Sequence, residues 1–383
     1  MLSDSSRRRY EGVAGTPAEV NVAVRSPYRV GVLAAALSLA SCASIGPITL
    51  ARDRVDYSTA VAESWKEQTL LNIVRLRYAD APTFLDVSSV IGSYGLGGQV
   101  VAGGAISSNL TQTVPWSAAT LSANGTYIDR PTISYTPLSG AKFARNLLKP
   151  IPPVAVFELI QAGYPADQIL MLTTRAINGI HGRSAVGARA RPPDPEFFPL
   201  IVALRRIQLS GAVSLRLDKG HPDESGAVII TAPHSAAIER DVRYVMTTLK
   251  LRPDRDGGLR IASGAVARDE HELALLTRSM LETLQEIGAG IDVPKLDIDS
   301  GRAAPSSWSA NAPATEDRPL INIHSGASQP SSAFVAVRYH GTWFWIDDRD
   351  YSSKGRFTFL LVFFSLAEAG VPQQAPMLTL PVN

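Results

Sequence analysis

The chain contains a single cysteine, Cys42, among its 383 residues. A cysteine thiolate is a nucleophile and a metal ligand, and the sulfur is also a site of covalent modification. One cysteine cannot form a disulfide within the chain, so the disulfide framework of many exported proteins is excluded. The residues around Cys42 must therefore decide between a free thiol, a nucleophile and a modified residue.

A second candidate site is the stretch from Trp343 to Asp350, which reads WFWIDDRD. Its residues with useful chemistry are two tryptophans, three carboxylates and one arginine, namely Trp343, Trp345, Asp347, Asp348, Arg349 and Asp350. Such side chains can contact a sugar, a cation or a protein partner, or act as a pair of acids. The favoured alternative is structural: a core strand runs into a helix, and Asp348 or Asp350 caps the helix amino terminus, where the dipole favours a carboxylate.

The remaining chemistry-bearing residues form no recognisable motif. The six histidines, at positions 181, 221, 234, 271, 324 and 340, include no pair with the helical spacing of a metal site. Neither a phosphate-binding loop nor a nucleophile elbow occurs. The sequence therefore predicts no metal, no cofactor and no catalytic residue, although a catalytic triad assembled from distant residues would leave no local signature.

Composition describes an ordinary globular protein, with 45% hydrophobic residues and a mean hydropathy of +0.05. The 37 basic residues include five within residues 1–41, and the 35 acidic residues include three there. The chain from residue 42 onward is therefore neutral. A nucleic-acid-binding protein usually carries a basic excess, so we expect no nucleic-acid partner.

The residues before Cys42 predict export. Val30 to Leu39 form an uncharged apolar run of ten residues, and Arg25 and Arg29 precede it. Small residues follow the run, as at a signal-peptidase cleavage site. Because about 20 apolar residues are needed to span a bilayer, this run predicts a signal peptide over residues 1–41.

The four residues Leu39-Ala40-Ser41-Cys42 resemble the lipobox of bacterial lipoproteins, which has an aliphatic residue, two small residues and a cysteine. The resemblance covers only this segment. It implies lipid transfer to the Cys42 sulfur, cleavage after Ser41 and acylation of the new amino terminus. Several acyl chains, such as palmitate, give stable membrane anchoring.

Ser44 bears on the destination of such a lipoprotein. In Gram-negative lipoproteins an aspartate two positions after the cysteine commonly retains the protein at the inner membrane. Ser44 stands at this position. The resemblance therefore implies anchoring in the outer membrane, facing the periplasm.

An unusual segment lies between Asp86 and Asp129, where 42 consecutive residues carry no charge. Even positions from 88 to 108 hold mainly apolar residues, namely Val90, Tyr94, Leu96, Val100, Ala102 and Ile106. Odd positions hold mainly small or polar residues, namely Ser89, Ser93, Gly95, Gly97, Gln99, Gly103 and Ser107. This period of two predicts a long strand with one apolar face. We expect a turn at residues 109–113 and return strands over residues 116–135, with a tight turn at Asn124-Gly125.

Two interpretations of this segment remain open, besides a partner-binding role. The favoured one is a Gly-rich antiparallel sheet inside a soluble domain. In the other, residues 87–128 form an amphipathic hairpin, and several copies of the chain each donate one hairpin to a shared barrel, because an open sheet edge is not tolerated in a bilayer. This arrangement resembles pore-forming outer-membrane lipoproteins, in architecture only.

The elements that position these residues predict an α+β fold. It has an N-terminal helix, a long Gly-rich antiparallel β-hairpin, a helical middle and a mixed α/β C-terminal part. After the signal peptide and a lipidated tether at 42–56, residues 57–210 contain the helix, the hairpin and the helical region. Helices are expected at residues 57–78, 142–148, 153–162, 165–177 and 196–209.

The C-terminal part has three expected regions: mixed strands and helices at 211–296, a linker at 297–319, and a small β-hairpin plus a buried helix at 320–383. Strands are expected at residues 213–217, 227–231, 259–262, 320–324, 333–339, 343–346 and 377–382. Helices are expected at residues 236–249, 269–287 and 354–369. The helix at 269–287 rests on a capping-box-like start at Asp269 and Glu272, and on an apolar stripe that follows. His340-Gly341 is expected to form a tight turn.

These observations predict a lipid-anchored envelope protein with a structural or interaction role. Its expected partners are membrane lipid through Cys42 and another envelope protein, with a homo-oligomer as a further expectation. The alternative is an oligomeric outer-membrane pore or secretion component that uses residues 87–128. A lipid-anchored hydrolase is the third alternative.

Overall fold

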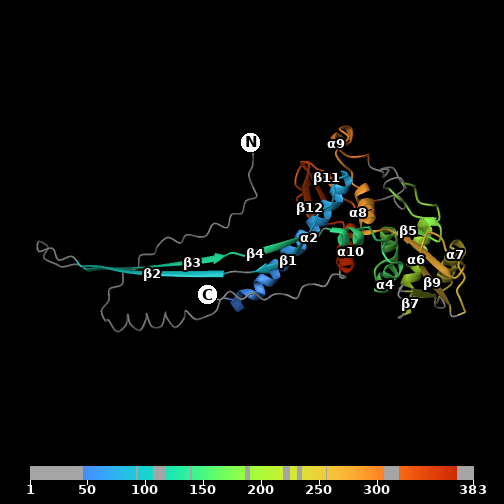
Figure 1. Ribbon diagram of the computed structural model, residues 1–383, viewed down its shortest axis with the longest axis horizontal. Coiled ribbons are helices and arrows are strands. Elements are labelled where there is room, and N and C mark those ends of the chain that lie inside the picture. Colours follow the sequence, from blue (N-terminus) through green and yellow to red (C-terminus); the bar gives the residue numbers. More distant parts are fainter. Residues whose placement is uncertain are drawn as a thin grey trace. The chain divides into compact units, whose positions relative to one another are not determined.

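The computed structural model describes residues 46–91, 94–106, 117–138, 140–185, 190–218, 225–230, 235–255, 257–305 and 319–368. Helices and antiparallel sheets are both well represented among them, which confirms the α+β class (Figure 1). The chain divides into two compact units, residues 1–59 with 87–136 and residues 60–86 with 137–383. Each unit is described by itself.

The first unit contains a long two-stranded ribbon. Its strands are β1 (Phe84–Ile91), β2 (Tyr94–Ile106), β3 (Ser117–Asp129) and β4 (Thr132–Leu138), of which β1 begins and β4 ends in the second unit. β2 pairs with β3 in antiparallel fashion, and β1 pairs with β4 (Figure 1). The long strand and its return are therefore confirmed, each as two strands. The turn predicted at residues 109–113 lies outside the described residues.

The tight turn predicted at Asn124-Gly125 is wrong. Both residues lie inside β3, where Asn124 pairs with Gln99 and Gly125 pairs with Gly98. An Asn-Gly pair only favours a turn locally. Here thirteen consecutive register pairs run through it, so the longer pairing prevails over the local preference.

Helix α2 (Gly46–Arg77) is longer than predicted and includes most of the expected tether. Pro47 lies in its first turn, where the missing proline N–H is not needed. In the second unit the helix buries Leu70, Ile73 and Val74. Close approach to α8 (Met280–Ala289) requires Gly288, since a Cβ there would lie 3.0 Å from the carbonyl oxygen of Ile73.

A six-stranded sheet forms the centre of the second unit, in the order β6-β5-β10-β9-β8-β7. Its strands are β5 (Thr174–Ile177), β6 (Ile180–His181), β7 (Val213–Asp218), β8 (Ser225–Ile230), β9 (Gly258–Ser263) and β10 (Glu272–Thr277). Only the β9–β10 pair is parallel. Strands from before and after residue 210 thus share one sheet. The helices that accompany it are α4 (Pro153–Gln161), α5 (Ala166–Thr173), α6 (Phe197–Leu209) and α7 (Ala236–Thr248) (Figure 1).

Two helix predictions in this region are partly wrong. The stretch expected as one helix at 269–287 is the strand β10 followed by α8. The run Leu273-Ala274-Leu275 is buried between two neighbouring strands, and such a short apolar run fits a buried strand as well as a helix. The capping box is formed by Ser279 and Glu282. Similarly, residues 174–177 form β5 and not the end of a helix.

A three-stranded antiparallel sheet lies near the end of the described chain, in the order β11-β13-β12. Its strands are β11 (His324–Gly326), β12 (Ala333–Tyr339) and β13 (Thr342–Asp347). His340-Gly341 forms the predicted turn, with φ values of 45° and 85°. The strand expected at 320–324 is wrong except for His324, and the strand expected at 377–382 lies outside the described residues.

Helix α10 (Tyr351–Glu368) follows this sheet and buries Phe357 and Leu360 completely, which confirms the predicted buried helix. Two further short helices lie among the described residues: α3 (Gly140–Leu148), which overlaps the helix predicted at 142–148, and α9 (Lys295–Asp299), which overlaps the start of the expected linker. Residues 306–318 of that linker lie outside the described part of the chain.

Candidate functional site

The predicted lipidation site, Cys42, and the predicted cleavage site, Ser41, lie outside the described residues. Lipidation therefore stays a prediction of the sequence. Within the described residues, no helix is both long enough and apolar enough to cross a membrane.

The uncharged ribbon is the most regular candidate site. Its strands pair residue by residue, from Tyr94 opposite Asp129 to Ile106 opposite Ser117. A directly opposite pair in an antiparallel sheet shares one face. The register therefore decides whether the alternation predicted for one strand is matched by its partner.

The register matches apolar positions with apolar positions along one face of the ribbon. This face holds the pairs Leu96–Tyr127, Val100–Ala123 and Ala102–Leu121. The other face holds the pairs Gly97–Thr126, Gln99–Asn124, Val101–Ser122, Gly103–Thr120 and Gly95–Ile128. Two apolar residues, Val101 and Ile128, thus lie on the mainly polar face, and they are 50% and 39% exposed. Toward the ends of the ribbon the pattern weakens, because Asp129 and Ser117 lie on the apolar face and the pair Ala105–Ala118 lies on the other. The ribbon is therefore mainly, but not strictly, amphipathic.

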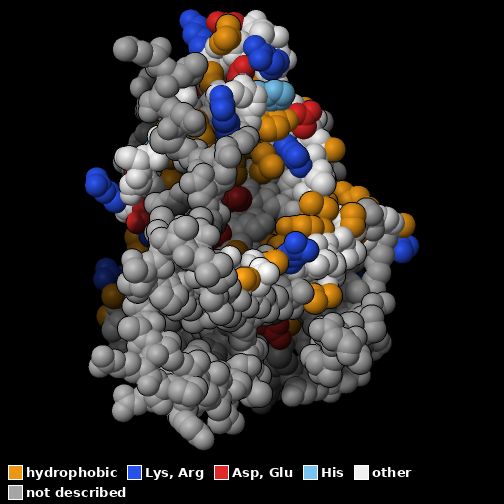
Figure 2. All heavy atoms as spheres, turned by 90° about the vertical axis from the view of Figure 1, so that its left-hand side faces the viewer, with side chains coloured by type: hydrophobic (Ala, Val, Ile, Leu, Met, Phe, Trp, Pro, Cys, Tyr) orange, Lys and Arg blue, Asp and Glu red, His pale blue; other side chains and the backbone are white. Residues whose placement is uncertain are grey.

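The edges of the ribbon are open. β2 and β3 form a sheet of two strands, and no other strand among the described residues pairs with either. An isolated two-stranded hairpin is marginally stable in water, and its unpaired N–H and C=O groups invite another strand. Exposed apolar side chains continue on β1 and β4, at Ile91, Ile133 and Tyr135. The ribbon therefore has the features of an assembly element. Figure 2 views the molecule from the left-hand side of Figure 1, and hydrophobic side chains gather on parts of the described surface there.

The carboxylates of the Trp343–Asp350 stretch are occupied structurally. Asp350 precedes α10 and accepts hydrogen bonds from the Ser353 backbone N–H at 3.0 Å and the Ser353 hydroxyl at 2.7 Å. It also accepts from Asn322 at 2.8 Å. Burial raises the pKa of Asp350, but these hydrogen bonds outweigh it and hold the pKa below its usual value. The predicted helix cap is therefore confirmed at Asp350.

The neighbouring charged residues are also engaged locally. Asp347 accepts a hydrogen bond from the backbone N–H of Arg349 at 2.8 Å. Asp348 forms an ion pair with Lys354 at 2.6 Å. The two tryptophans lie within β13 and are only partly buried. Asp348 and Asp350 are thus engaged at the start of the helix, whereas Asp347 ends β13 in the same alternation as the tryptophans.

The titratable side chains of the described residues do not converge on a catalytic centre. In the part of the chain that the structure describes, no group of three or more His, Cys, Asp or Glu residues has the arrangement of a metal site. Nε2 of His340 lies 3.8 Å from a carboxylate oxygen of Asp80. The same carboxylate accepts a hydrogen bond from the hydroxyl of Tyr339. Burial and this hydrogen bond raise the pKa of Tyr339 to about 12, so it is not an acid or base near neutral pH. The cluster of Asp80, Tyr339 and His340 is therefore better suited to a structural role than to catalysis.

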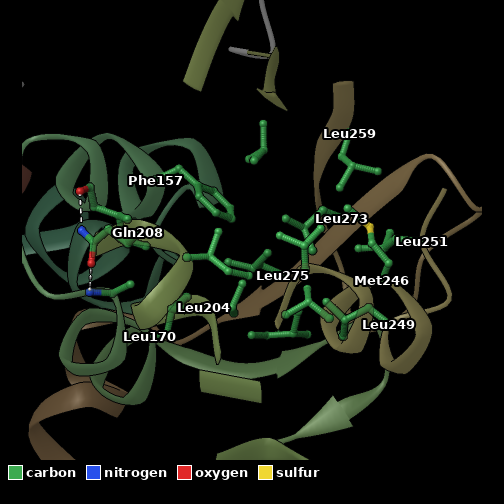
Figure 3. A pocket seen from close by; sticks show the side chains of 17 residues that line it. Phe157, Leu170, Leu204, Gln208, Met246, Leu249, Leu251, Leu259, Leu273 and Leu275 are labelled. Atoms are coloured by element: carbon green, nitrogen blue, oxygen red, sulfur yellow. Dashed lines mark hydrogen bonds between the residues drawn. The ribbon is translucent and has the colours of Figure 1, made fainter. Parts of the chain in front are cut away.

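An apolar cavity of about 60 Å³ lies in the second unit, among residues of α4 to α7 and the six-stranded sheet (Figure 3). Phe157, Leu204 and Leu275 are among its lining residues, and Gln208 is the one polar side chain among the described residues that line it. The Gln208 amide is fully used, because it donates to the carbonyl oxygens of Ile160 and Tyr164 and accepts from Ala166 N–H. A cavity that admits benzene measures about 150 Å³. We interpret this one as a dry packing gap.

Comparison with known proteins adds no relative. No protein family, curated protein or solved structure matches this chain. Function must therefore be argued from its own residues. Sequence reasoning singled out the ribbon and the two tryptophans, but it missed the residues that flank the tryptophans on β11 and β12. The alternation Trp-Phe-Trp-Ile was the available signal, since it predicts that one face of the strand carries both tryptophans.

Proposed function

We propose that this protein is a lipid-anchored component of an outer-membrane assembly, and that copies of the chain join through their β2–β3 ribbons. The observation that carries the proposal is the ribbon itself: thirteen register pairs, no charge between Asp86 and Asp129, and two open edges among the described residues. Edge-to-edge pairing would satisfy the unpaired backbone groups without any new element. The lipobox at Cys42 supports the anchor.

A second candidate function follows from the amphipathic register. If the joined ribbons close on themselves, they form a barrel with the Val100 face toward lipid and the Gln99 face toward water. Strands of 9–11 residues suffice to cross a bilayer, and β2 and β3 each have 13. Closure would leave no open edge in the bilayer, as its hydrocarbon core requires. The protein would then be a pore or secretion component.

The anchor is tested by expressing the full chain in a Gram-negative host with a labelled fatty acid, followed by membrane fractionation. The wild type should take up label and sediment with the outer membrane, whereas Cys42→Ala should do neither. Ser44→Asp provides a matched control, since it should take up label but stay at the inner membrane. A soluble, unlabelled wild type would contradict the anchor.

The ribbon is tested with two neighbouring substitutions on opposite faces, Gln99→Lys and Val100→Lys, in the full chain purified in detergent. A charge on a lipid-facing position costs about 2–4 kcal/mol at the bilayer centre, whereas a water-facing position tolerates it. Native mass spectrometry should show oligomers for the wild type and Gln99→Lys. If the ribbons lie in the bilayer, it should show monomers for Val100→Lys. A monomeric wild type would overturn the proposed assembly.

The pore candidate needs its own measurement. In planar bilayers the wild type should conduct ions, and Gln99→Lys should shift selectivity toward anions, because the new charge would line the channel. Oligomers that do not conduct, with both lysine variants equally assembled, would place the ribbon outside the bilayer. That result would leave the assembly proposal and refute the pore.

A further inference from the structure

The sheet β11-β13-β12 has one buried face and one that carries tryptophans. Phe344 and Ile346 are completely buried on the core side of β13. Trp343 and Trp345 alternate with them and are only partly buried, so they belong to the opposite face. The solvent side of an antiparallel sheet normally carries polar residues. Two indoles there form a feature that core packing does not explain.

The register shows what surrounds the two indoles. Trp343 is flanked by Gly326 on β11 and Arg338 on β12. Trp345 is flanked by His324 on β11 and Ala336 on β12. Two of these neighbours, Gly326 and Ala336, are small, and the larger neighbours Arg338 and His324 carry polar groups. We call these six residues the tryptophan face.

Gly326 determines how Trp345 lies. A Cβ at Gly326 would come within 3.2 Å of Cη2 and 3.3 Å of Cζ3 of the Trp345 ring. The indole therefore extends over β11 at the one position where no side chain obstructs it. The His324 ring follows at 5.6 Å with a tilt of 33°, so its plane is not far from that of Trp345. The result is a broad aromatic surface and not an upright single ring.

Hydrogen-bonding groups lie at the ends of this surface. Arg338 is exposed and forms no ion pair with another described residue. Asp347 continues the alternation beyond Trp345 and uses one of its oxygens on the Arg349 backbone N–H. Arg338 thus supplies a donor at one end of the surface and Asp347 supplies an acceptor at the other, while His324 lies beside the Trp345 ring. The remaining acids of the stretch, Asp348 and Asp350, are engaged elsewhere.

We propose that the tryptophan face binds a saccharide. The C–H groups on one face of a pyranose ring carry partial positive charge and suit the negative face of an indole. The ring hydroxyls need both donors and acceptors at its rim, which Arg338, His324 and Asp347 supply. Trp343 and Trp345 lie about 7 Å apart along the strand, so a short chain of sugars can contact both. A cation is disfavoured, since only one carboxylate is available.

The proposal is tested with the full chain by titration with three probes: hexa-N-acetylglucosamine, maltohexaose and hexagalacturonate. Tryptophan emission reports binding, and the change should saturate with at least one probe. Trp343→Ala and Trp345→Ala should each weaken binding about tenfold or more, as for an anchoring aromatic residue. Trp65→Phe, on α2, is the matched control and should leave the affinity unchanged.

Two further variants separate binding from folding. Gly326→Ala keeps every binding side chain but displaces the Trp345 indole, so it should weaken binding while far-UV circular dichroism stays unchanged. Arg338→Gln should weaken binding, whereas Arg243→Gln on α7, which is also an exposed arginine, should not. The proposal is overturned if none of the three probes changes the emission, or if the double variant Trp343→Ala/Trp345→Ala binds as tightly as the wild type by calorimetry.

Discussion

The hydroxyl of Tyr78 donates a hydrogen bond of 2.7 Å to the carboxylate of Asp297, which ties the end of α2 to α9. Both residues are buried. Burial and this hydrogen bond raise the pKa of Tyr78 well above its usual value. The Tyr78 ring also contacts Phe344 of β13, edge-on at 6.1 Å between centroids. One side chain therefore links three segments of the second unit that are far apart in sequence.

We expect Tyr78→Phe to lower the free energy of unfolding by about 1–3 kcal/mol, because it keeps the ring but removes the donor to one oxygen of the buried Asp297 carboxylate, whose other oxygen stays paired with Arg302. Urea denaturation of the full chain measures the loss. Tyr351→Phe is the control, since Tyr351 is 88% exposed and its loss should cost less than about 0.5 kcal/mol. Equal effects of the two substitutions would show that the Tyr78 hydroxyl contributes nothing.

Arg278 stabilises the end of α5 through hydrogen bonds to backbone carbonyl groups. Its buried guanidinium donates to the carbonyl oxygens of Met171, Leu172, Thr174 and Arg183. The last carbonyls of a helix have no partner within the helix. Arg278 supplies that partner, at the cost of burial that lowers its own pKa.

Arg278→Gln should therefore lower the free energy of unfolding by about 3 kcal/mol or more, since several buried carbonyl groups lose their donor together. Arg278→Lys should rescue only part of the loss, because a lysine lacks the planar fork that reaches separate carbonyls. Thermal melting compares both with Arg243→Gln, which changes an exposed arginine. Full rescue by lysine would mean that charge, and not the fork, is what the site requires.

The Asp350 helix cap predicts that the stability of the protein depends on pH in the acid range. Its folded pKa lies below the unfolded value of about 3.9, so its contribution to stability is present above that pH. The contribution is lost as the pH falls below about 3.9 toward the folded pKa. We expect Asp350→Asn to destabilise the protein near pH 6 and to differ less from the wild type near pH 2. A difference that stays constant in urea denaturation over this range would exclude the ionised cap.

Local signals in the sequence predicted the elements around Asp350 well. The strand over residues 333–339, the turn at His340-Gly341 and the helix that follows all depend on nearby residues, and all are present. The sequence indicated only part of the tryptophan face. Its flanking residues His324, Gly326 and Arg338 reach Trp343 and Trp345 through strand register, which no local pattern encodes.

Short apolar runs were the main source of error. Leu273 to Leu275 lie in a strand that is covered on both faces, so their side chains show no alternation that would distinguish strand from helix. Without the neighbouring strands β5 and β9, the same residues suit the stripe of a helix. Tertiary pairing decided the outcome here, and it is the part that a single sequence specifies least directly.

The two Asn-Gly pairs in the chain give the clearest comparison of local and long-range control. At Asn178-Gly179, φ values of 44° and 87° form the tight turn between β5 and β6. The Asn178 side chain secures this turn, since it donates to the carbonyl oxygen of Leu249 and accepts from the Ala274 backbone N–H. Asn124-Gly125 has no such side-chain partner among the described residues and lies in extended β3.

Gly179→Ala should lower the free energy of unfolding by about 1–2 kcal/mol, because an alanine side chain is strained at positive φ. Gly125→Ala should change it by less than about 0.5 kcal/mol, since Gly125 lacks a positive φ and a Cβ there would meet no atom within 4 Å. Urea denaturation of both variants makes the comparison. If Gly125→Ala were as costly as Gly179→Ala, the extended register of the ribbon would be wrong, and the opposite faces assigned to Gln99 and Val100 would fail with it.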